Sequence, residues 1–253
     1  MSSAVSIITP TFQRHALLKA QHVHLLAQTV QDFEWLILDD GPEPSAYFKG
    51  LSDPRIRYHH LAGPKMKVSA KRNWLCERSR GPVIAQFDDD DYYAPDYLAV
   101  MLNRLTESCA DITKLSGWFV YSAQLKRLGW WDTTSPLGLH FTFGPEPVLN
   151  AFFNKEAPDT MKNNYAGYGF SYVFKKSMWE KAPFPHVEYA SDYGFVAAAL
   201  AKGCRLDHFA DTQGLCLHVL RKDNMSKSFP QYLLPDFMLA KLFSADLSAL
   251  LDS

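Results

Sequence analysis

The residues with the clearest potential for chemistry are four consecutive aspartates, Asp88–Asp91, which follow the apolar segment Val83–Phe87. Neighbouring carboxylates repel one another, so a folded chain that keeps four together needs an offsetting positive charge, most often a divalent cation. Mg2+ and Mn2+ suit such a run, because they take one or two carboxylates and complete their coordination with phosphate oxygens. A solvated acidic turn is the alternative. The segment Tyr92–Pro95 follows at once and marks a strand-to-helix junction rather than a tail, which favours a metal-binding site.

The segments around these aspartates alternate between strand and helix patterns. Short apolar, β-branched runs predict strands over 5–9, 33–38, 56–61 and 83–87. Apolar residues at helical spacing predict helices over 14–30, 66–79 and 95–107. We therefore expect an α/β fold with a mostly parallel central sheet and helices on both faces. Ligands bind such sheets beyond the carboxyl ends of the strands. Both Asp39-Asp40 and the four aspartates fall at such ends, so one shared cleft is expected.

The second half of the chain has a looser pattern. It predicts a loop over 138–157, a helix over 191–202, a hairpin of 118–122 with 126–131, and strands over 171–174 and 214–219. No internal repeat or long linker is present, so we expect a single domain over residues 1–226. This domain divides into halves of about 1–107 and about 108–226.

Residues 227–253 form a tail whose apolar positions predict one amphipathic helix from Pro230 onward. We expect this helix to pack back on the domain. Contact with a second subunit, giving a homodimer, or peripheral contact with a membrane is the alternative. Within the helix predicted from Pro230 onward, the acids Asp236, Asp246 and Asp252, against the single Lys241, do not favour an anionic membrane.

Composition excludes several classes of protein. The formal net charge of -1 argues against a general binder of nucleic acid or anionic membranes. The N-terminus lacks the pattern of a signal peptide, and the longest apolar run, Phe195–Ala201, is too short to span a bilayer. The four cysteines lie far apart without a Cys-x-x-Cys pair, which indicates neither a zinc ribbon nor a dense disulfide framework. A cytoplasmic protein without a transmembrane segment is expected.

Three motifs occur in order along the chain: Val5-Ser6-Ile7-Ile8-Thr9-Pro10-Thr11-Phe12-Gln13-Arg14, Phe33-Glu34-Trp35-Leu36-Ile37-Leu38-Asp39-Asp40-Gly41, and Gly81-Pro82-Val83-Ile84-Ala85-Gln86-Phe87-Asp88-Asp89-Asp90-Asp91. Together they resemble family-two inverting glycosyltransferases of the GT-A fold, strongly over residues 4–105 and traceably to about residue 226. The resemblance implies a Rossmann-like nucleotide-binding half followed by an acceptor-binding half. It also implies transfer of a sugar from a nucleotide-diphosphate sugar, with UDP favoured, to an acceptor hydroxyl in polysaccharide or glycan assembly.

The resemblance assigns nucleotide-binding roles to residues of the first half. The first-strand loop that lines the base is matched by Pro10, Thr11, Phe12 and Arg14. Asp40 matches the carboxylate that reads the base edge, whereas Asp39 is expected to cap the turn. Lys67 matches a basic position near the base or phosphate. Lys71 and Arg72 are weaker candidates, because exposed cations on helices are usually solvated.

The resemblance also implies a metal site, since Asp88-Asp89-Asp90 meets the family's Asp-x-Asp pattern. On that alignment Asp90 holds Mn2+ or Mg2+, and Asp88 or Asp89 faces the ribose. The metal offsets the charge that develops on the leaving diphosphate. The frame is ambiguous by one residue, because Asp91 is also acidic. His218 is a second metal candidate, with a hydrogen-bonded structural histidine as the alternative.

Inverting transfer needs a base that takes the proton from the acceptor hydroxyl. The resemblance places this base at Asp192, with Glu188 in reserve and helix capping as the alternative role of Asp192. The loop where donor sugar and acceptor meet is matched by Gly167, Tyr168 and Gly169. Three tryptophans could stack on sugar rings, although the core is their commoner location: Trp118, Trp130 and Trp131.

Two other functions are weighed against transfer. A sugar-phosphate nucleotidyltransferase would carry a glycine-rich phosphate loop after its first strand, where this chain has residues 9–14 without glycine. A degenerate domain that binds nucleotide-sugar or glycan without turnover is the non-enzyme alternative. The expected partners of the enzyme are a nucleotide-sugar and a glycan or lipid-linked acceptor, with no nucleic acid.

Overall fold

The computed structural model describes residues 3–144, 148–152, 161, 163–187, 189–222, 224, 226–243 and 247–251. The strands of its main sheet are β1 (Val5–Thr11), β2 (Phe33–Asp39), β3 (Ile56–His60), β4 (Val83–Gln86), β5 (Tyr92–Tyr93), β6 (Ile112–Ser122), β7 (Arg127–Asp132), β10 (Val173–Lys175), β11 (Leu206–Ala210), β12 (Cys216–Leu220) and β13 (Tyr232–Leu234). A separate pair consists of β8 (Gly138–Thr142) and β9 (Val148–Phe152).

The helices lie between these strands in chain order. They are α1 (His15–Leu26), α2 (Ala46–Lys49), α3 (Val68–Arg78), α4 (Tyr97–Glu107), α6 (Lys176–Lys181), α7 (Ser191–Ala201), α8 (Phe237–Leu242) and α9 (Ser248–Leu251), with the 3-10 turns η1 (Asn164–Ala166) and η2 (Gly169–Ser171). Among the described residues, none of these helices combines the length and the apolar character needed to cross a bilayer.

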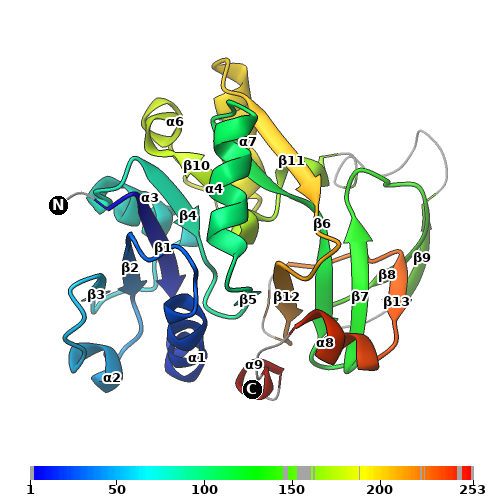
Figure 1. Cartoon of the computed structure of the whole chain (residues 1–253), viewed down its shortest axis with the longest axis horizontal. Coiled ribbons are helices and arrows are strands. Elements are labelled where there is room, and N and C mark those ends of the chain that lie inside the picture. The colour runs from blue at the N-terminus through cyan, green and yellow to red at the C-terminus, as the bar shows by residue number, and fades with distance from the viewer. Residues whose placement is uncertain are drawn as a thin grey trace.

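The main sheet joins a parallel half to a mixed half (Figure 1). Strands β3, β2, β1 and β4 lie side by side and run parallel, with Thr11 opposite Asp39 and Ile8 opposite Gln86. Strand β10 lies antiparallel between β4 and β6 and connects the halves. Because the parallel strands end at the same edge, the residues that follow β1, β2 and β4 come together there. The predicted α/β fold with a mostly parallel sheet is confirmed.

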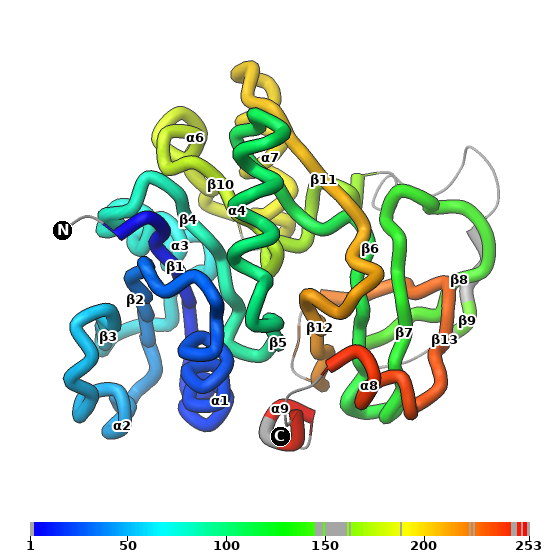
Figure 2. Tube along the Cα trace, in the orientation of Figure 1, coloured from blue at the N-terminus to red at the C-terminus, as the bar shows by residue number. Residues whose placement is uncertain are grey.

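Helices cover both faces of the parallel half because side chains alternate along its strands. Ile7 of β1 belongs to the apolar cluster that contains Leu18 of α1, whereas the next residue, Ile8, belongs to the cluster that contains Leu75 of α3 and Phe195 of α7. Figure 2 shows α3 lying beside β1 and β2, which it contacts, and α1 following directly on the end of β1. Both faces of β1 and β2 are therefore buried, which explains their continuous apolar sequences.

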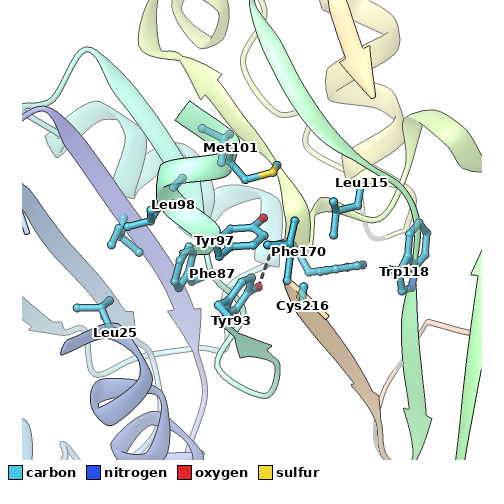
Figure 3. Packing of buried hydrophobic residues seen from close by; sticks show 14 of the residues in the cluster. Leu25, Phe87, Tyr93, Tyr97, Leu98, Met101, Leu115, Trp118, Phe170 and Cys216 are labelled. Atoms are coloured by element: carbon cyan, nitrogen blue, oxygen red, sulfur yellow. Dashed lines mark hydrogen bonds between the residues drawn. The ribbon is translucent and has the colours of Figure 1, made fainter. Parts of the chain in front are cut away.

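Two stacked aromatic rings hold together the two ends of the loop that carries the four aspartates (Figure 3). Phe87, just before the loop, stacks on Tyr93, just after it, with ring centroids 3.9 Å apart. The Tyr93 hydroxyl donates to the carbonyl oxygen of Phe170 at 2.8 Å and accepts from the Asp88 amide at 3.0 Å. The apolar core therefore fixes both ends of the acidic loop and ties it to the second half of the chain.

One prediction for the second half is confirmed and another is wrong. The expected hairpin is formed by β6 and β7, which pair from Gly117 opposite Asp132 to Ser122 opposite Arg127. The segment 138–157 was expected to be a loop, but its described residues form the antiparallel pair β8 and β9. Alternating residues such as Leu139, His140 and Phe141 fit an extended strand, and this short pattern has too little apolar content to stand out in the sequence.

The tail is not the single helix that its apolar spacing predicts. Residues 232–234 form β13, which pairs antiparallel with the edge strand β7, and only afterwards do the short helices α8 and α9 follow. Pro235 explains the difference, because a proline disfavours helical backbone at the preceding residue. Further on, the tail does pack on the domain. The rings of Tyr92 and Phe119 contact Phe243 at centroid distances of 5.6 and 5.8 Å, and Leu250 is fully buried.

Candidate active site

The ends of β1, β2 and β4 are joined by one hydrogen-bonded network. Thr11 Oγ1 donates to Asp89 Oδ2 at 2.5 Å, although the two residues are 78 positions apart. Lys71 Nζ donates to the Thr11 carbonyl oxygen at 2.9 Å and to Asp40 Oδ1 at 2.6 Å. Both acidic clusters of the sequence therefore belong to a single site at this edge of the sheet.

Asp91 is committed to a structural pair. Its side chain is 0% exposed, and its carboxylate accepts from the Val219 amide at 2.9 Å and contacts His218 Nδ1 at 2.9 Å. Burial alone would lower the pKa of His218, but the charge and hydrogen bond of Asp91 raise it above its ordinary value. Since Asp91 is occupied in this way, Asp88, Asp89 and Asp90 remain as the acids available to a ligand.

Asp90 lies where positive side chains converge. Its Oδ2 accepts from Arg14 Nη1 at 2.5 Å and from Asn224 Nδ2 at 3.4 Å, and it lies 3.7 Å from Arg221 Nη1. Burial, followed by repulsion from Asp91 and the other aspartates, raises the pKa of Asp90 to about 7 despite these partners. The local negative charge is therefore only partly offset, which is the condition under which a cation binds.

Asp192 is linked to the aspartate run by one arginine that lies near both. Arg72 Nη1 contacts Asp192 Oδ1, and Arg72 Nη2 lies 3.8 Å from Asp88 Oδ1. The second oxygen of Asp192 accepts from the Gly169 amide at 2.9 Å. The N-terminal capping position of α7 is occupied by Ala190, so the capping alternative for Asp192 is wrong. The reserve base, Glu188, lies outside the described residues.

The expectation that Lys71 and Arg72 are solvated helix cations is wrong. Lys71 is 3% exposed and Arg72 is 5% exposed. Burial lowers the pKa of Lys71, although its bond to Asp40 opposes this effect. The face of α3 that carries Lys71 and Arg72 is turned toward the edge of the sheet rather than toward solvent. Both cations therefore belong to the candidate site, although their spacing in the sequence indicated an exposed position.

Asp40 and Asp39 differ in their partners. Both oxygens of Asp40 are bonded, to Lys71 and to the Met66 amide at 2.5 Å, so Asp40 fixes the segment that enters α3. Asp39 accepts from the Gly41 amide at 2.9 Å, as expected for a residue that caps its turn, and from the Tyr58 hydroxyl at 2.7 Å.

The remaining predicted nucleotide residues lie around this network. Pro10 is half-buried at the end of β1, and the Phe12 ring has Lys65 Nζ 4.5 Å from its centre. Arg14 reaches two aspartates of the run, with Asp89 Oδ1 at 3.2 Å. Lys67 occupies the N-terminal capping position of α3, half-buried. The structure thus brings the first loop and the entrance to α3 to the same edge as the acids.

The glycine loop packs directly on Asp192. A Cβ atom at Gly169 would lie 2.8 Å from Asp192 Cγ and 2.8 Å from Gln86 Nε2. Tyr168 adopts φ +62° and donates from its hydroxyl to the carbonyl oxygen of Lys227 at 2.6 Å. Gly167 is buried beside it. The loop therefore holds the candidate base through a backbone contact that only glycine permits.

Gly169→Ala is expected to destabilise the protein by about 1–3 kcal/mol, because the added methyl group overlaps Asp192 and Gln86. Donor turnover should fall with it, since Asp192 must move. Gly50→Ala is the matched control, because a Cβ atom there meets only carbonyl oxygens at 3.5 and 3.6 Å. Urea unfolding and nucleoside diphosphate release measure the two effects. Equal results for the two variants would contradict the assigned contact.

The tryptophans belong mainly to the core. Trp118 and Trp131 are 0% exposed and meet edge to face, so neither presents a surface to a sugar ring. Trp130 is half-buried and donates from Nε1 to the carbonyl oxygen of Asp211 at 2.9 Å. Beside Trp118 lies Lys114, fully buried, whose Nζ donates to the Tyr165 carbonyl oxygen at 2.8 Å.

Because Lys114 is buried, we expect the stability of the protein to depend on pH. Burial lowers its pKa to about 7, although the charge of Asp192 opposes the shift. The unfolded chain keeps the proton to a higher pH than the folded one, so stability rises with pH over this interval by about 1.4 kcal/mol per pH unit. Relative to Lys114→Met, the wild type should therefore gain stability from about pH 7 to about pH 10. Urea unfolding of both proteins tests this, and parallel curves would contradict it.

The described residues fit a metal that binds together with a diphosphate. No group of three or more His, Cys, Asp or Glu side chains among them lies close enough to form a metal site alone. Mg2+ and Mn2+ need only one or two protein oxygens when phosphates supply the rest. Nε2 of His218 is buried without a hydrogen-bond partner in the described part of the chain, while Nδ1 faces Asp91. A carboxylate-oriented histidine of this kind presents Nε2 to a metal.

A parallel half joined to a mixed half, with acids at the strand ends, is the arrangement of the GT-A class of glycosyltransferase folds, and solved structures of that class match the chain. TarS 1-349 of S. aureus in complex with UDP-GlcNAc matches with a TM-score of 0.63, at 14% identity over 87% of this chain and 59% of that one. The mannosyltransferase PcManGT from Pyrobaculum calidifontis, in complex with GDP-Man and Mn2+, matches with a TM-score of 0.59, at 14% identity over 88% and 59%.

The family follows from the sequence. Residues 6–164 match the family described as Glycosyl transferase family 2, and the chain belongs to this family of glycosyltransferases. Among curated relatives, the putative colanic acid biosynthesis glycosyl transferase WcaA of Escherichia coli (strain K12) is 32% identical over 102 residues, 39% of this chain. The uncharacterized glycosyltransferase EpsJ of Bacillus subtilis (strain 168) is 33% identical over 111 residues, 42% of this chain. The matches span 36% and 30% of the lengths of those relatives.

Proposed function

We propose that this glycosyltransferase is metal-dependent and inverting, and that it moves a sugar from a nucleotide-diphosphate sugar to an acceptor hydroxyl. The observation that carries the proposal is the position of Asp192. This residue follows the aspartate run by more than a hundred positions, yet it shares Arg72 with Asp88. Its side chain is 24% exposed, unlike Asp90 at 7%, so an acceptor can reach it.

The residues of the network divide the donor-binding work. Asp90, together with Nε2 of His218, would hold Mn2+ or Mg2+, which would offset the charge of the diphosphate. Asp88 or Asp89 would face the ribose. The first loop, with Phe12 and Arg14, would line the nucleotide. Asp40 supports this surface through Lys71 and the Met66 amide.

The transfer step is a single displacement. The acceptor oxygen bonds to the anomeric carbon of the sugar as the bond from that carbon to the diphosphate oxygen breaks. The proton of the acceptor hydroxyl passes to a carboxylate oxygen of Asp192, and the nucleoside diphosphate leaves with the bonding electron pair. Because attack comes from the face opposite the leaving group, the configuration at that carbon inverts. The loop formed by Gly167, Tyr168 and Gly169 would border the sugar and the acceptor.

Support for the donor and the pathway comes from similar proteins. TarS has been solved with UDP-GlcNAc and with UDP, and PcManGT with GDP-Man and Mn2+. We therefore propose a UDP-sugar first and a GDP-sugar second. WcaA is described as a putative colanic acid biosynthesis glycosyl transferase, which supports polysaccharide or glycan assembly with a glycan or lipid-linked acceptor. No observation favours a nucleotidyltransferase, since the family match is to glycosyltransferases.

Calorimetric titration tests the donor site. UDP, GDP and TDP are titrated into the protein with Mn2+ and again with a chelator. Metal-dependent binding of one nucleotide is the expected result, because the partly offset charge around Asp90 needs both the cation and the diphosphate. If none of the three nucleotides binds under either condition, the chain is not a donor-binding enzyme and the buried aspartates serve only to hold their loop.

A further inference from the structure

Both oxygens of the candidate base have a partner before any substrate arrives. One oxygen of Asp192 contacts Arg72 Nη1 and the other accepts from the Gly169 amide at 2.9 Å. A proton on Asp192 would leave the Arg72 guanidinium without its counter-charge, so proton transfer is favoured once Arg72 has another anion to bind. Because the Gly169 amide is part of the backbone, Arg72 is the partner that can be removed by a side-chain movement.

Arg72 has the properties of a group that can exchange partners. Its guanidinium lies between the base and the aspartate run, with Nη2 3.8 Å from Asp88 Oδ1. The side chain is 7% exposed, and Nε is buried without a hydrogen-bond partner in the described residues. Neighbouring contacts are weak, since Nη1 lies 3.5 Å from Ser191 Oγ and the Phe184 ring centre is 5.6 Å from the guanidinium carbon. A buried cation with an unused donor favours a ligand with more oxygens than a carboxylate offers.

We propose that Arg72 is a positioning residue that pairs with Asp192 in the ligand-free protein and transfers to the diphosphate of the donor, which releases Asp192 to accept the proton of the acceptor. This inference rests on the proposed function, because it takes the aspartate run as the place where the diphosphate binds. A phosphate group competes well for a guanidinium, since the two form parallel charge-assisted hydrogen bonds. Binding of the diphosphate would thereby prepare the base only when the donor site is occupied.

The competition has a consequence that can be measured by binding alone. If Asp192 and the diphosphate compete for Arg72, removing the charge of Asp192 must strengthen nucleotide binding. This gain must also depend on Arg72. A simple loss of negative charge near an anion would instead strengthen binding whether or not the arginine is present. The two explanations therefore separate in a double-mutant cycle.

The cycle uses calorimetric titration of UDP with Mn2+, or of GDP with Mn2+ where the donor titration selects GDP. Asp192→Asn is expected to bind about threefold to tenfold more tightly than the wild type, as the ligand then meets an unpaired arginine. Arg72→Met is expected to bind about tenfold more weakly, and the double variant should match Arg72→Met. Arg78→Met, an exposed arginine of the same helix paired with Glu77, is the control and should bind like the wild type.

Each outcome decides the inference. A gain from Asp192→Asn that persists with Met at position 72 would show a plain charge effect and overturn it, as would unchanged or weaker binding by Asp192→Asn. Thermal unfolding identifies a variant that has lost its fold. In that case Arg72→Lys, which keeps the charge but cannot contact two acids at once, replaces Arg72→Met and should show a smaller loss. If the wild type binds no nucleotide, the proposed function fails as well, and the two failures are thus distinguishable.

Discussion

Asp192→Asn is expected to lower donor turnover by about a thousandfold while the variant continues to bind the nucleotide. Asparagine keeps the shape of the side chain and can still accept from the Gly169 amide, so the loop around it should stay in place. The amide cannot take the proton of the acceptor hydroxyl, and the displacement then lacks its base. Release of nucleoside diphosphate from the donor sugar measures the effect.

The matched control for this variant is Asp96→Asn. Asp96 also lies at the start of a helix, is exposed, and makes no capping hydrogen bond with its side chain. It should keep the turnover of the wild type. Near-normal turnover by Asp192→Asn would remove Asp192 as the base and direct the search to Glu188.

Asp90→Asn is expected to weaken metal-dependent nucleotide binding by about a hundredfold or more. The reason is electrostatic. Asp90 carries a charge that burial and its acidic neighbours disfavour, with a pKa of about 7, and that charge is what a divalent cation would neutralise. Titration of UDP or GDP in the presence of Mn2+ and of a chelator measures the change.

The same substitution should raise the free energy of unfolding of the metal-free protein by about 1 kcal/mol, because it relieves repulsion within the aspartate run. Thermal unfolding without metal checks this second effect. Together, the titration and the unfolding measurement distinguish the loss of a metal-binding carboxylate from the loss of the fold. Unchanged affinity with Mn2+ would transfer the metal-binding role from Asp90 to another aspartate.

Much of the parallel half could be predicted from the sequence. Continuous apolar runs such as Trp35–Leu38 have few alternatives to a buried strand, and the turn residues after them place both acidic clusters at strand ends. The prediction that these ends meet followed from the geometry of parallel sheets. The network from Asp40 through Lys71 and Thr11 to Asp89 agrees with that expectation.

What the sequence did not reveal depends on contacts between distant segments. Helical spacing in α3 shows which residues share a face, but it does not show that this face meets the sheet edge, so Lys71 and Arg72 were undervalued. The pairing of Asp91 with His218 spans 127 positions. A lone histidine in a sequence carries no information about such a partner. Asn224 reaches Asp90 by the same long-range route.

The tail shows a different limit. Its apolar residues satisfy helical spacing, but a strand edge was open beside them, and β13 completes β7 instead. Pro235 was the available signal, since it ends any helix that would begin at Pro230. The spacing of apolar residues correctly predicted an amphipathic segment, but pairing with the neighbouring strand β7 made its first part a strand rather than a helix.

We propose above all that Asp90 and Asp192 act together in transfer from a nucleotide-sugar. The most direct measurement is nucleoside diphosphate release from a panel of UDP- and GDP-sugars, with water as the acceptor, by the wild type with Mn2+, by the wild type with a chelator, and by Asp192→Asn with Mn2+. We expect release from donors of one nucleotide class by the wild type with Mn2+ and a collapse of release in the other two conditions. Equal release by the wild type and Asp192→Asn, or nucleotide binding without release from any donor, would contradict it.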